Sequence, residues 1–329
     1  MIRESVCCVL GAGYSCAAGL PVTAQLFEED VYISSRAAQT RFERVWRDYD
    51  SWREENAERN VEEYLRDLYL GDRGALSPPF AWAAEIIAAV LSTPRTQDSA
   101  LVNPRYAVRL TRPLRCTVHE DFWACILTCF DTVSVVTTNY DICVERCLRH
   151  RRMARSPMPG FFYGGLARPQ TASGVALPWR TEGRMRVVAL EGSVPLLKLH
   201  GSLNWALQNG TIVLYQDTRA AFRHGGDAAI VPPIPEKKIP NWLQPVWAES
   251  ERRLSSARYW IVCGYSLPSY DTAMYQMLSK AGTGGKKKVF ILDPASRRLR
   301  ERWKAVVRHG DIVCVSGLPD GISELATQM

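Results

Sequence analysis

Three polar residues stand directly after short apolar runs, where they could do chemistry. Asn139 and Asp141 follow VSVVTT (133–138), and His200 follows PLLKL (195–199). An imidazole with an ordinary pKa of about 6.5 accepts a proton near neutral pH, while an amide and a carboxylate orient water or a sugar hydroxyl. Together they indicate a site that positions water and removes a proton. Singly, each also has a structural explanation: Asn139 or Asp141 could cap a helix, and His200 could be a satisfied histidine at a strand end.

A glycine-rich loop follows the first apolar run. Val6–Leu10 leads into GAGYSCAAGLP (11–21), which precedes a helix. Glycine lets the backbone approach a pyrophosphate, and a helix start offers free N–H groups. The strict GxGxxG pattern fails because residue 16 is Cys, so an ordinary Rossmann dehydrogenase is disfavoured. A tight turn without a ligand is the alternative. Asp293, which ends a later run, could bond an adenosine ribose.

Alternating strands and helices must position these residues. Runs that are apolar on both faces predict strands at 6–10, 133–138, 195–200, 259–265, 288–293 and 312–317. Helices fit between several of them, at 140–150, 242–256, 271–281 and 295–307. This alternation predicts an α/β, Rossmann-like, mostly parallel sheet with helices on both faces. Ligands of such sheets bind beyond the carboxyl ends of the strands.

The remaining chain predicts a helical insertion within one domain. Helical periodicity runs from about Ala24 into the thirties, and residues 36–130 look mainly helical. VEEYLRDLYL (61–70) and TVHEDFWACILTCF (117–130) are two of these helices, and Pro78 and Pro79 open another. We therefore expect a single domain over 1–329, with its core at about 1–35, 131–150 and 190–329, the insertion at about 36–130, and a long connection at 151–190.

Composition indicates a soluble globular protein, and the cysteine spacing gives little support to a metal site. The net charge of +7 (41 basic minus 34 acidic residues) is mild for 329 residues, so we expect no direct nucleic-acid partner. No signal peptide or membrane span is evident. The ten cysteines lie mostly in apolar runs, without any CxxC pair, which favours a reducing cytoplasm. Two pairs spaced by four, at 125/129 and 143/147, leave a zinc site as a weak alternative.

Five ordered motifs resemble the sirtuin superfamily, and more closely its divergent, NAD-hydrolysing branch in bacterial antiphage defence proteins. GAGYSCAAGLP is similar to the sirtuin phosphate loop, TTNYD (137–141) to its TQNxD, and LHGS (199–202) to the strand with the catalytic histidine. GYSLPSYD (264–271) and ILDP (291–294) resemble the closing strands. VEEYL and the PP segment before Lys237 and Lys238 are similar to the divergent branch.

The resemblance implies that NAD is the ligand and assigns residues to its parts. His200 would be the base, and Asn139 would position the water or the ribose. The expected cofactor-binding residues are Gly11, Ala12, Gly13 and Ser15 at the phosphates, Thr138 and Asp141 near the nicotinamide ribose, Gly264, Ser266 and Asp293 on the adenosine side, and Gly19 and Pro21 in the loop.

Departures from the deacylase pattern favour hydrolysis. Deacylases carry Asp-Phe-Arg after the GxP, where this chain has Val22, Thr23 and Ala24. The family's Phe helps to shield the reacting sugar from water. The four-cysteine zinc module and the strand that binds an acyl-lysine peptide have no counterpart, and Thr138 replaces Gln. The prediction is an NAD+ glycohydrolase, which forms nicotinamide and ADP-ribose without a metal.

The resemblance also implies a role and partners. Proteins of this branch deplete NAD during infection. We therefore expect this enzyme to be inactive until it forms a homo-oligomer or until a co-encoded ATPase or Argonaute-type partner activates it. Nucleic acid would act only indirectly. Three alternatives stay open: a protein deacylase, an ADP-ribosyltransferase, and a non-catalytic module that binds NAD or ADP-ribose.

Overall fold

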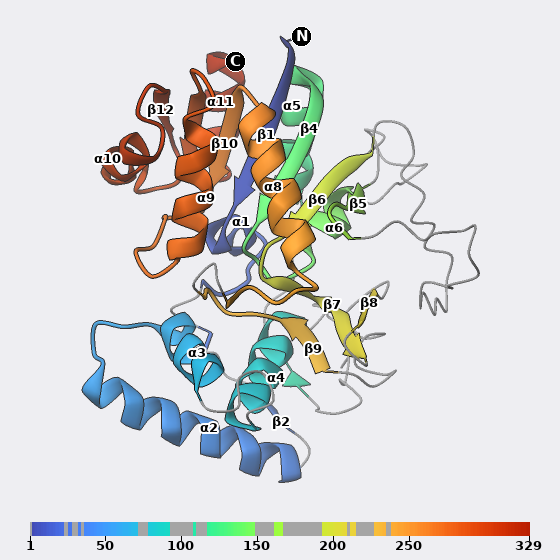
Figure 1. The fold of residues 1–329 in the computed structure, drawn as a ribbon, viewed down its shortest axis with the longest axis vertical. Helices are drawn as coiled ribbons and strands as arrows, with labels where there is room; N and C mark the ends of the chain where they lie inside the picture. Colours follow the sequence, from blue (N-terminus) through green and yellow to red (C-terminus); the bar gives the residue numbers. More distant parts are fainter. Residues whose placement is uncertain are drawn as a thin grey trace, which may run out of the picture.

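The structure is a computed structural model that describes residues 2–22, 26–27, 32–33, 36–71, 78–92, 108–109, 117–148, 161–166, 193–208, 211–214, 227–234 and 238–329. Its centre is a seven-stranded parallel sheet (Figure 1), which confirms the predicted fold class. The strand order is β12 (Asp311–Val315), β11 (Lys288–Leu292), β10 (Tyr259–Cys263), β1 (Ile2–Leu10), β4 (Phe130–Thr137), β6 (Val194–Lys198) and β5 (Phe161–Tyr163).

Helices cover both faces of this sheet, which is why its strands are apolar throughout. Residues 6–10 of β1, in the middle of the sheet, are at most 1% exposed. Helices α8 (Gln244–Ser256) and α9 (Thr272–Gly282) pack together on one face, and α10 (Ser296–Val306) packs beside α9. Helices α5 (Thr117–Cys129), α6 (Cys143–Leu148) and α11 (Gly321–Gln328) lie on the other face.

The predicted insertion forms a second apolar core beyond the carboxyl ends of the strands (Figure 1). Helices α2 (Arg36–Glu55), α3 (Val61–Leu70) and α4 (Pro78–Ser92) build it. The core is continued towards the sheet by Tyr140, Leu203 and Ile230. Helix α5, which the prediction placed in the insertion, instead packs on the sheet through Phe122, Trp123 and Ile126. Its apolar stripe fits either place, so the sequence alone could not decide.

The predicted helix from Ala24 into the thirties is wrong where the structure describes it. Leu26 and Phe27 lie in a turn, and their side chains join the insertion's core. Strand β2 (Tyr32–Ile33) pairs antiparallel with β3 (Val108–Arg109). Contacts with distant residues therefore override the local helical period. The other positions of that stretch lie outside the described residues.

A small antiparallel sheet, absent from the prediction, begins directly after His200. It consists of β8 (Thr211–Leu214), β7 (Gly201–Gln208) and β9 (Asp227–Ile230) in that order. Strand β7 has no simple pattern of buried apolar and exposed polar residues, because polar Ser202 and Asn204 are as buried as Leu203 and Trp205. Strand β6 ends at Lys198, two residues before the predicted end, and His200 lies in the turn between the two strands. Most of the predicted connection at 151–190 lies outside the described residues, although β5 falls within it.

Two further features concern the described residues as a whole. No helix within the described ranges combines the length and apolarity that crossing a membrane requires. Every cysteine within them is a free thiol, and several in β1 and α6 are buried. Burial raises the pKa of the Cys7 thiol to about 12, so this cysteine is a packing residue and no nucleophile.

Candidate functional site

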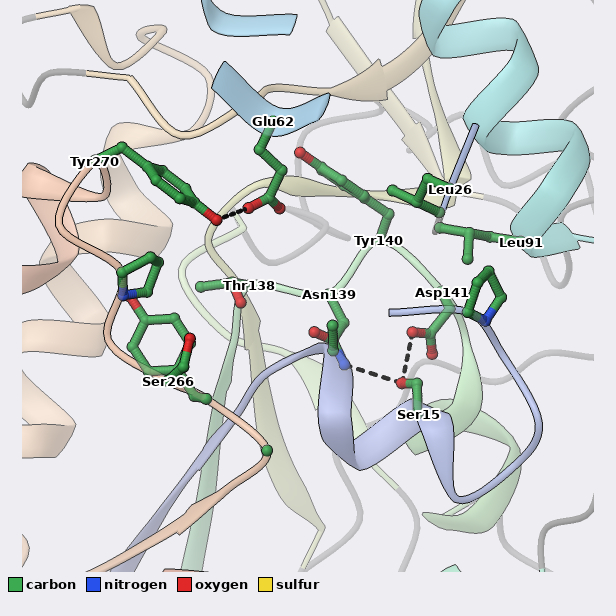
Figure 2. Close-up of a pocket in the computed structure, with 15 residues that line it drawn as sticks. Ser15, Leu26, Glu62, Leu91, Thr138, Asn139, Tyr140, Asp141, Ser266 and Tyr270 are labelled. Carbon is green, nitrogen blue, oxygen red and sulfur yellow. Dashed lines mark hydrogen bonds between the residues drawn. The ribbon is translucent and has the colours of Figure 1, made fainter. Parts of the chain in front are cut away.

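A cleft lies at the carboxyl ends of β1, β4 and β10, where parallel sheets bind ligands. Its empty volume is about 600 Å³, open solvent included. The sheet side provides one wall and the helical insertion provides the other, through Glu62 of α3 and Leu91 of α4 (Figure 2). The full lining is Ala12, Ser15, Pro21, Leu26, Glu62, Leu91, Thr138, Asn139, Tyr140, Asp141, Gly264, Tyr265, Ser266, Pro268 and Tyr270.

Three predicted residues form one hydrogen-bonded cluster on the sheet side. The Asn139 amide donates to Ser15 Oγ at 2.9 Å and to the Gly11 carbonyl at 2.8 Å. Ser15 Oγ in turn donates to Asp141 Oδ2 at 2.6 Å, and Asp141 Oδ1 accepts the Cys143 N–H that opens α6. Asp141 is therefore both a helix-capping and a site residue. Asn139 Oδ1 accepts no hydrogen bond from the described residues, so it can accept one from a hydroxyl or a water.

The loop glycines Gly11 and Gly13 allow their backbone to pack closely against the backbone that follows β10. The N–H groups of Gly11 and Gly13 donate to the carbonyls of Cys263 and Gly264, at 3.1 and 3.0 Å. A Cβ on Gly13 would come within 2.7 Å of Gly264 Cα, and one on Gly11 within 2.5 Å of Gly264 O. Gly264 itself has a φ of +63°. The N–H groups of Gly11 and Gly13, which were expected to hold phosphates, are thus bonded within the protein, and the loop members that line the cleft are Ala12, Ser15 and Pro21.

The predicted site residues divide into two groups. Those that line the cleft are Ala12, Ser15, Pro21, Thr138, Asn139, Asp141, Gly264 and Ser266. Those that do not line it are Gly11, Gly13, Gly19, His200 and Asp293. Asp293 Oδ1 accepts the Ala295 N–H at 2.7 Å at the start of α10, so the structure gives it a local role outside the cleft wall.

His200 is buried beside the cleft without lining it. The residue is 2% exposed, and its ring centroid lies 6.1 Å from that of Tyr140, which does line the cleft, and 6.4 Å from that of Trp247. Its Nδ1 has no hydrogen-bond partner among the described residues. Burial lowers the pKa of His200 below its usual value, although the Asp271 carboxylate and the Thr138 backbone oppose this shift. The imidazole is therefore neutral at physiological pH.

A buried lysine, which the sequence reading overlooked, fixes the backbone beneath the cluster. Lys198 is 1% exposed, pairs with Glu145 at 2.9 Å, and donates to the carbonyls of Tyr140 and Asp141. Glu145 also accepts from the Tyr163 hydroxyl at 3.0 Å. A cation in the middle of the apolar run PLLKL was the available signal, because lysine is almost never buried without partners.

A glutamate on the insertion wall was also overlooked. The Tyr270 hydroxyl donates to Glu62 Oε2 at 2.7 Å, across the cleft from Asn139 (Figure 2). Burial raises the pKa of Glu62 to about 7, with a smaller contribution from the Asp271 and Glu63 carboxylates, while the Tyr270 hydrogen bond opposes the rise. In the sequence, Glu62 stands outside the apolar stripe formed by Val61, Tyr64 and Leu65. Apart from the similarity of VEEYL to the divergent branch, nothing in the sequence shows that Glu62 meets a cleft.

The arrangement can orient a hydroxylated ligand and a water molecule. It has an unpaired amide oxygen, two carboxyl groups and several tyrosines around one cleft. Within the described ranges, no three or more His, Cys, Asp or Glu residues come close enough to hold a metal ion.

Comparisons with known proteins complete this description. No protein-family model and no curated protein matches the chain. It is similar to a solved structure of Sir2 in complex with an inhibitor, 2′-O-acetyl-ADP-ribose and a deacetylated peptide, at 14% identity and a TM-score of 0.40, with 99% of this chain and 92% of that chain covered. It is also similar to a Sir2 homologue–NAD complex, at 12% identity and a TM-score of 0.44, with 99% and 88% covered. Likenesses this remote carry no argument, so the fold rests on the strand order and the function rests on the site.

Proposed function

We propose that this protein is an NAD+ glycohydrolase, which converts NAD+ and water into nicotinamide, ADP-ribose and a proton. The observation that carries the proposal is the Ser15–Asn139–Asp141 cluster at the carboxyl edge of the sheet, with an amide oxygen left free towards the cleft. The order of the sirtuin-like motifs supports NAD as the substrate. The absence of the shielding Asp-Phe-Arg sequence after Pro21 favours water as the acceptor.

The chemistry requires a site that holds a ribose and places a water. Nicotinamide leaves as a neutral ring, so the glycosidic bond breaks without an acid to protonate it. In this proposal Asn139 Oδ1 accepts a hydrogen bond from the water or from a ribose hydroxyl. Since the N–H groups of Gly11 and Gly13 are used within the protein, contacts to the phosphates fall to Ala12, Ser15 and Ser266.

His200 is proposed to accept a proton or a hydrogen bond from a ribose hydroxyl or the water. Its neutral ring and the unpartnered Nδ1 suit that role. Because His200 does not line the cleft, the role requires a rearrangement when the substrate binds, and we propose that the neighbouring Tyr140 ring turns aside. Tyr140 Oη donates to the Val231 carbonyl at 3.2 Å, and this hydrogen bond would have to break.

Product identification tests the proposal. Purified protein is incubated with excess NAD, and the products are identified by mass spectrometry. Equal amounts of nicotinamide and free ADP-ribose are expected. Acyl-ADP-ribose in the presence of an acylated peptide would indicate a deacylase, and ADP-ribose attached to protein would indicate a transferase. Calorimetric binding of NAD without any nicotinamide release, even with the candidate partners present, would replace the enzyme with a binding module.

The proposed biological role is that of an NAD-depleting effector in antiphage defence. It rests on the resemblance to the divergent branch, and it includes activation by self-association or by a co-encoded ATPase or Argonaute-type partner. The test is the NAD content of bacteria that express the chain with its neighbouring genes, before and after infection. A fall upon infection that is absent for Asn139→Ala is expected, and an unchanged NAD content would contradict the role.

A further inference from the structure

Two carboxylates line the cleft, and they differ in how much of their bonding capacity the protein uses. Asp141 is engaged at both oxygens, by Ser15 Oγ and by the Cys143 N–H. Glu62 receives one hydrogen bond, from Tyr270, at Oε2, and its Oε1 accepts none from the described residues. Glu62 is therefore the carboxylate that is free to take a proton from something in the cleft.

The local structure of α3 holds Glu62 in place. Asn60 Oδ1 accepts the Glu62 N–H at 2.9 Å and the Glu63 N–H at 3.2 Å, and the Glu63 side chain accepts the Asn60 N–H, which completes a capping box. The apolar stripe of α3 is buried against α2 and α4. With its backbone anchored and its carboxyl held by Tyr270, Glu62 points across the cleft towards Thr138 and Asn139 (Figure 2).

We propose that Glu62 is a further catalytic residue of this site, the general base that removes a proton from the attacking water, which leaves the ribose hydroxyl as the partner of His200. The inference rests on the proposed NAD hydrolysis. As the bond between nicotinamide and the ribose breaks, its electron pair leaves with nicotinamide. The water oxygen forms the new bond to the ribose carbon, and one water proton moves to Glu62 Oε1. That proton is later lost to solvent, so the balance is NAD+ plus water to nicotinamide, ADP-ribose and a proton.

The surroundings of Glu62 suit a base that works near neutral pH. Burial raises its pKa to about 7, where enzymes commonly hold a catalytic glutamate. The titratable groups that face it come from three elements: Glu63 on α3, Tyr140 and Asp141 after β4, and Tyr265, Tyr270 and Asp271 after β10. Nearby carboxylates raise its pKa, and the Tyr270 hydroxyl lowers it. Glu62 is thus largely ionised only above about pH 7.

The experiment measures nicotinamide release from NAD between about pH 5 and about pH 9 for the wild type and three variants. Glu62→Gln keeps the acceptor for Tyr270 but cannot take the proton, so kcat should fall about 10²- to 10⁴-fold, with little change in KM and with loss of the acidic limb. Tyr270→Phe removes the hydrogen bond that lowers the pKa of Glu62, so the acidic limb should move to higher pH. Glu58→Gln, an exposed change of the same charge outside the cleft, should match the wild type.

The outcomes separate the inference from the function on which it rests. If the wild type hydrolyses NAD and Glu62→Gln does so with the same rate and pH profile, the role of Glu62 is overturned while NAD hydrolysis stands. If Glu62→Gln fails to fold by circular dichroism, Tyr270→Phe decides, because an unshifted limb would then overturn the role. If the wild type releases no nicotinamide even with the candidate partners present, although calorimetry detects NAD binding, the proposed function fails and the role of Glu62 fails with it.

Discussion

At the scale of single residues, the site is a set of buried polar groups of which a few lack partners. The side-chain amide of Asn139 donates two hydrogen bonds, and its Oδ1 keeps its capacity to accept one. His200 Nδ1 and Glu145 Oε2 are buried without partners among the described residues. An unpaired buried polar atom costs about 1–3 kcal/mol, so such atoms persist where a ligand or a function compensates them.

The first prediction concerns Asn139 and His200. Asn139→Ala and His200→Ala should each lower the NAD turnover about 10²-fold or more, because each removes a group that orients the reacting atoms. Both proteins should remain folded, since the losses are confined to the site. Asn241→Ala, at an exposed asparagine, is the matched control. Full turnover in both site variants, measured by nicotinamide release, would remove the mechanism.

The second prediction concerns the pH dependence of stability at Glu62. Its folded pKa of about 7 exceeds the ordinary value of 4.5, so the folded state binds the proton more tightly than the unfolded state. The ionised carboxylate therefore destabilises the fold progressively as the pH rises from 4.5 towards about 7. Relative to wild type, Glu62→Gln should gain about 1–3 kcal/mol between these limits. Urea unfolding at both ends of this range measures the gain, and equal differences at both would disprove the raised pKa.

At the scale of elements, the segment after β4 is held by the strand beside it. Lys198 of β6 pairs with Glu145 of α6 and donates to the carbonyls of Tyr140 and Asp141. One buried cation thus fixes a strand, a helix and the loop that carries the site. Breaking such a pair leaves an uncompensated charge in the interior.

The third prediction tests this support. Lys198→Met should lower the free energy of unfolding by about 3–5 kcal/mol, and adding Glu145→Gln should restore part of it because the unpaired charge is gone. Both variants should also lose kcat, since the two carbonyls lose their donor. Lys304→Met, which breaks an exposed pair with Glu301, should leave the free energy of unfolding nearly unchanged, because solvent screens such a pair. Equal effects at the two lysines would show that burial of Lys198 is unimportant.

At the scale of the whole molecule, the cleft is lined by residues of two parts, the central sheet with its helices and the helical insertion. The sheet brings Ser15, Asn139 and Asp141, and the insertion brings Glu62. The aromatic ring of Tyr140 lines the cleft and also packs in the insertion's core. A ligand in the cleft would contact both parts and therefore strengthen their association.

The fourth prediction follows from this shared wall. NAD at about 100 times its Kd should raise the free energy of unfolding by about 2.7 kcal/mol. Hydrogen exchange should slow in α3 as well as in the segment after β4, and it should change little in α11, none of whose residues lines the cleft. Slower exchange in the sheet without any change in α3 would show that the insertion takes no part in binding.

The sequence by itself determined the parallel sheet and the edge of that sheet at which the polar residues of the site lie. Strands buried on both faces must be apolar throughout, so their runs mark β1, β4, β6, β10, β11 and β12, and the residues after them mark one rim. That argument reached Asn139 and Asp141, which come after β4 along the chain, and the resemblance of the loop after β1 added Ser15. It also indicated α3 and α4, through an apolar stripe and a pair of prolines.

Only the tertiary structure decided which polar faces meet. Glu62 and Tyr270 are 208 residues apart, and the amphipathic pattern of α3 does not distinguish a face towards solvent from a face towards a cleft. Packing likewise buried His200 beside Tyr140 and turned Gly11 and Gly13 towards Gly264. Local periodicity reports whether a side chain is buried, whereas the identity of its neighbours depends on how distant elements pack.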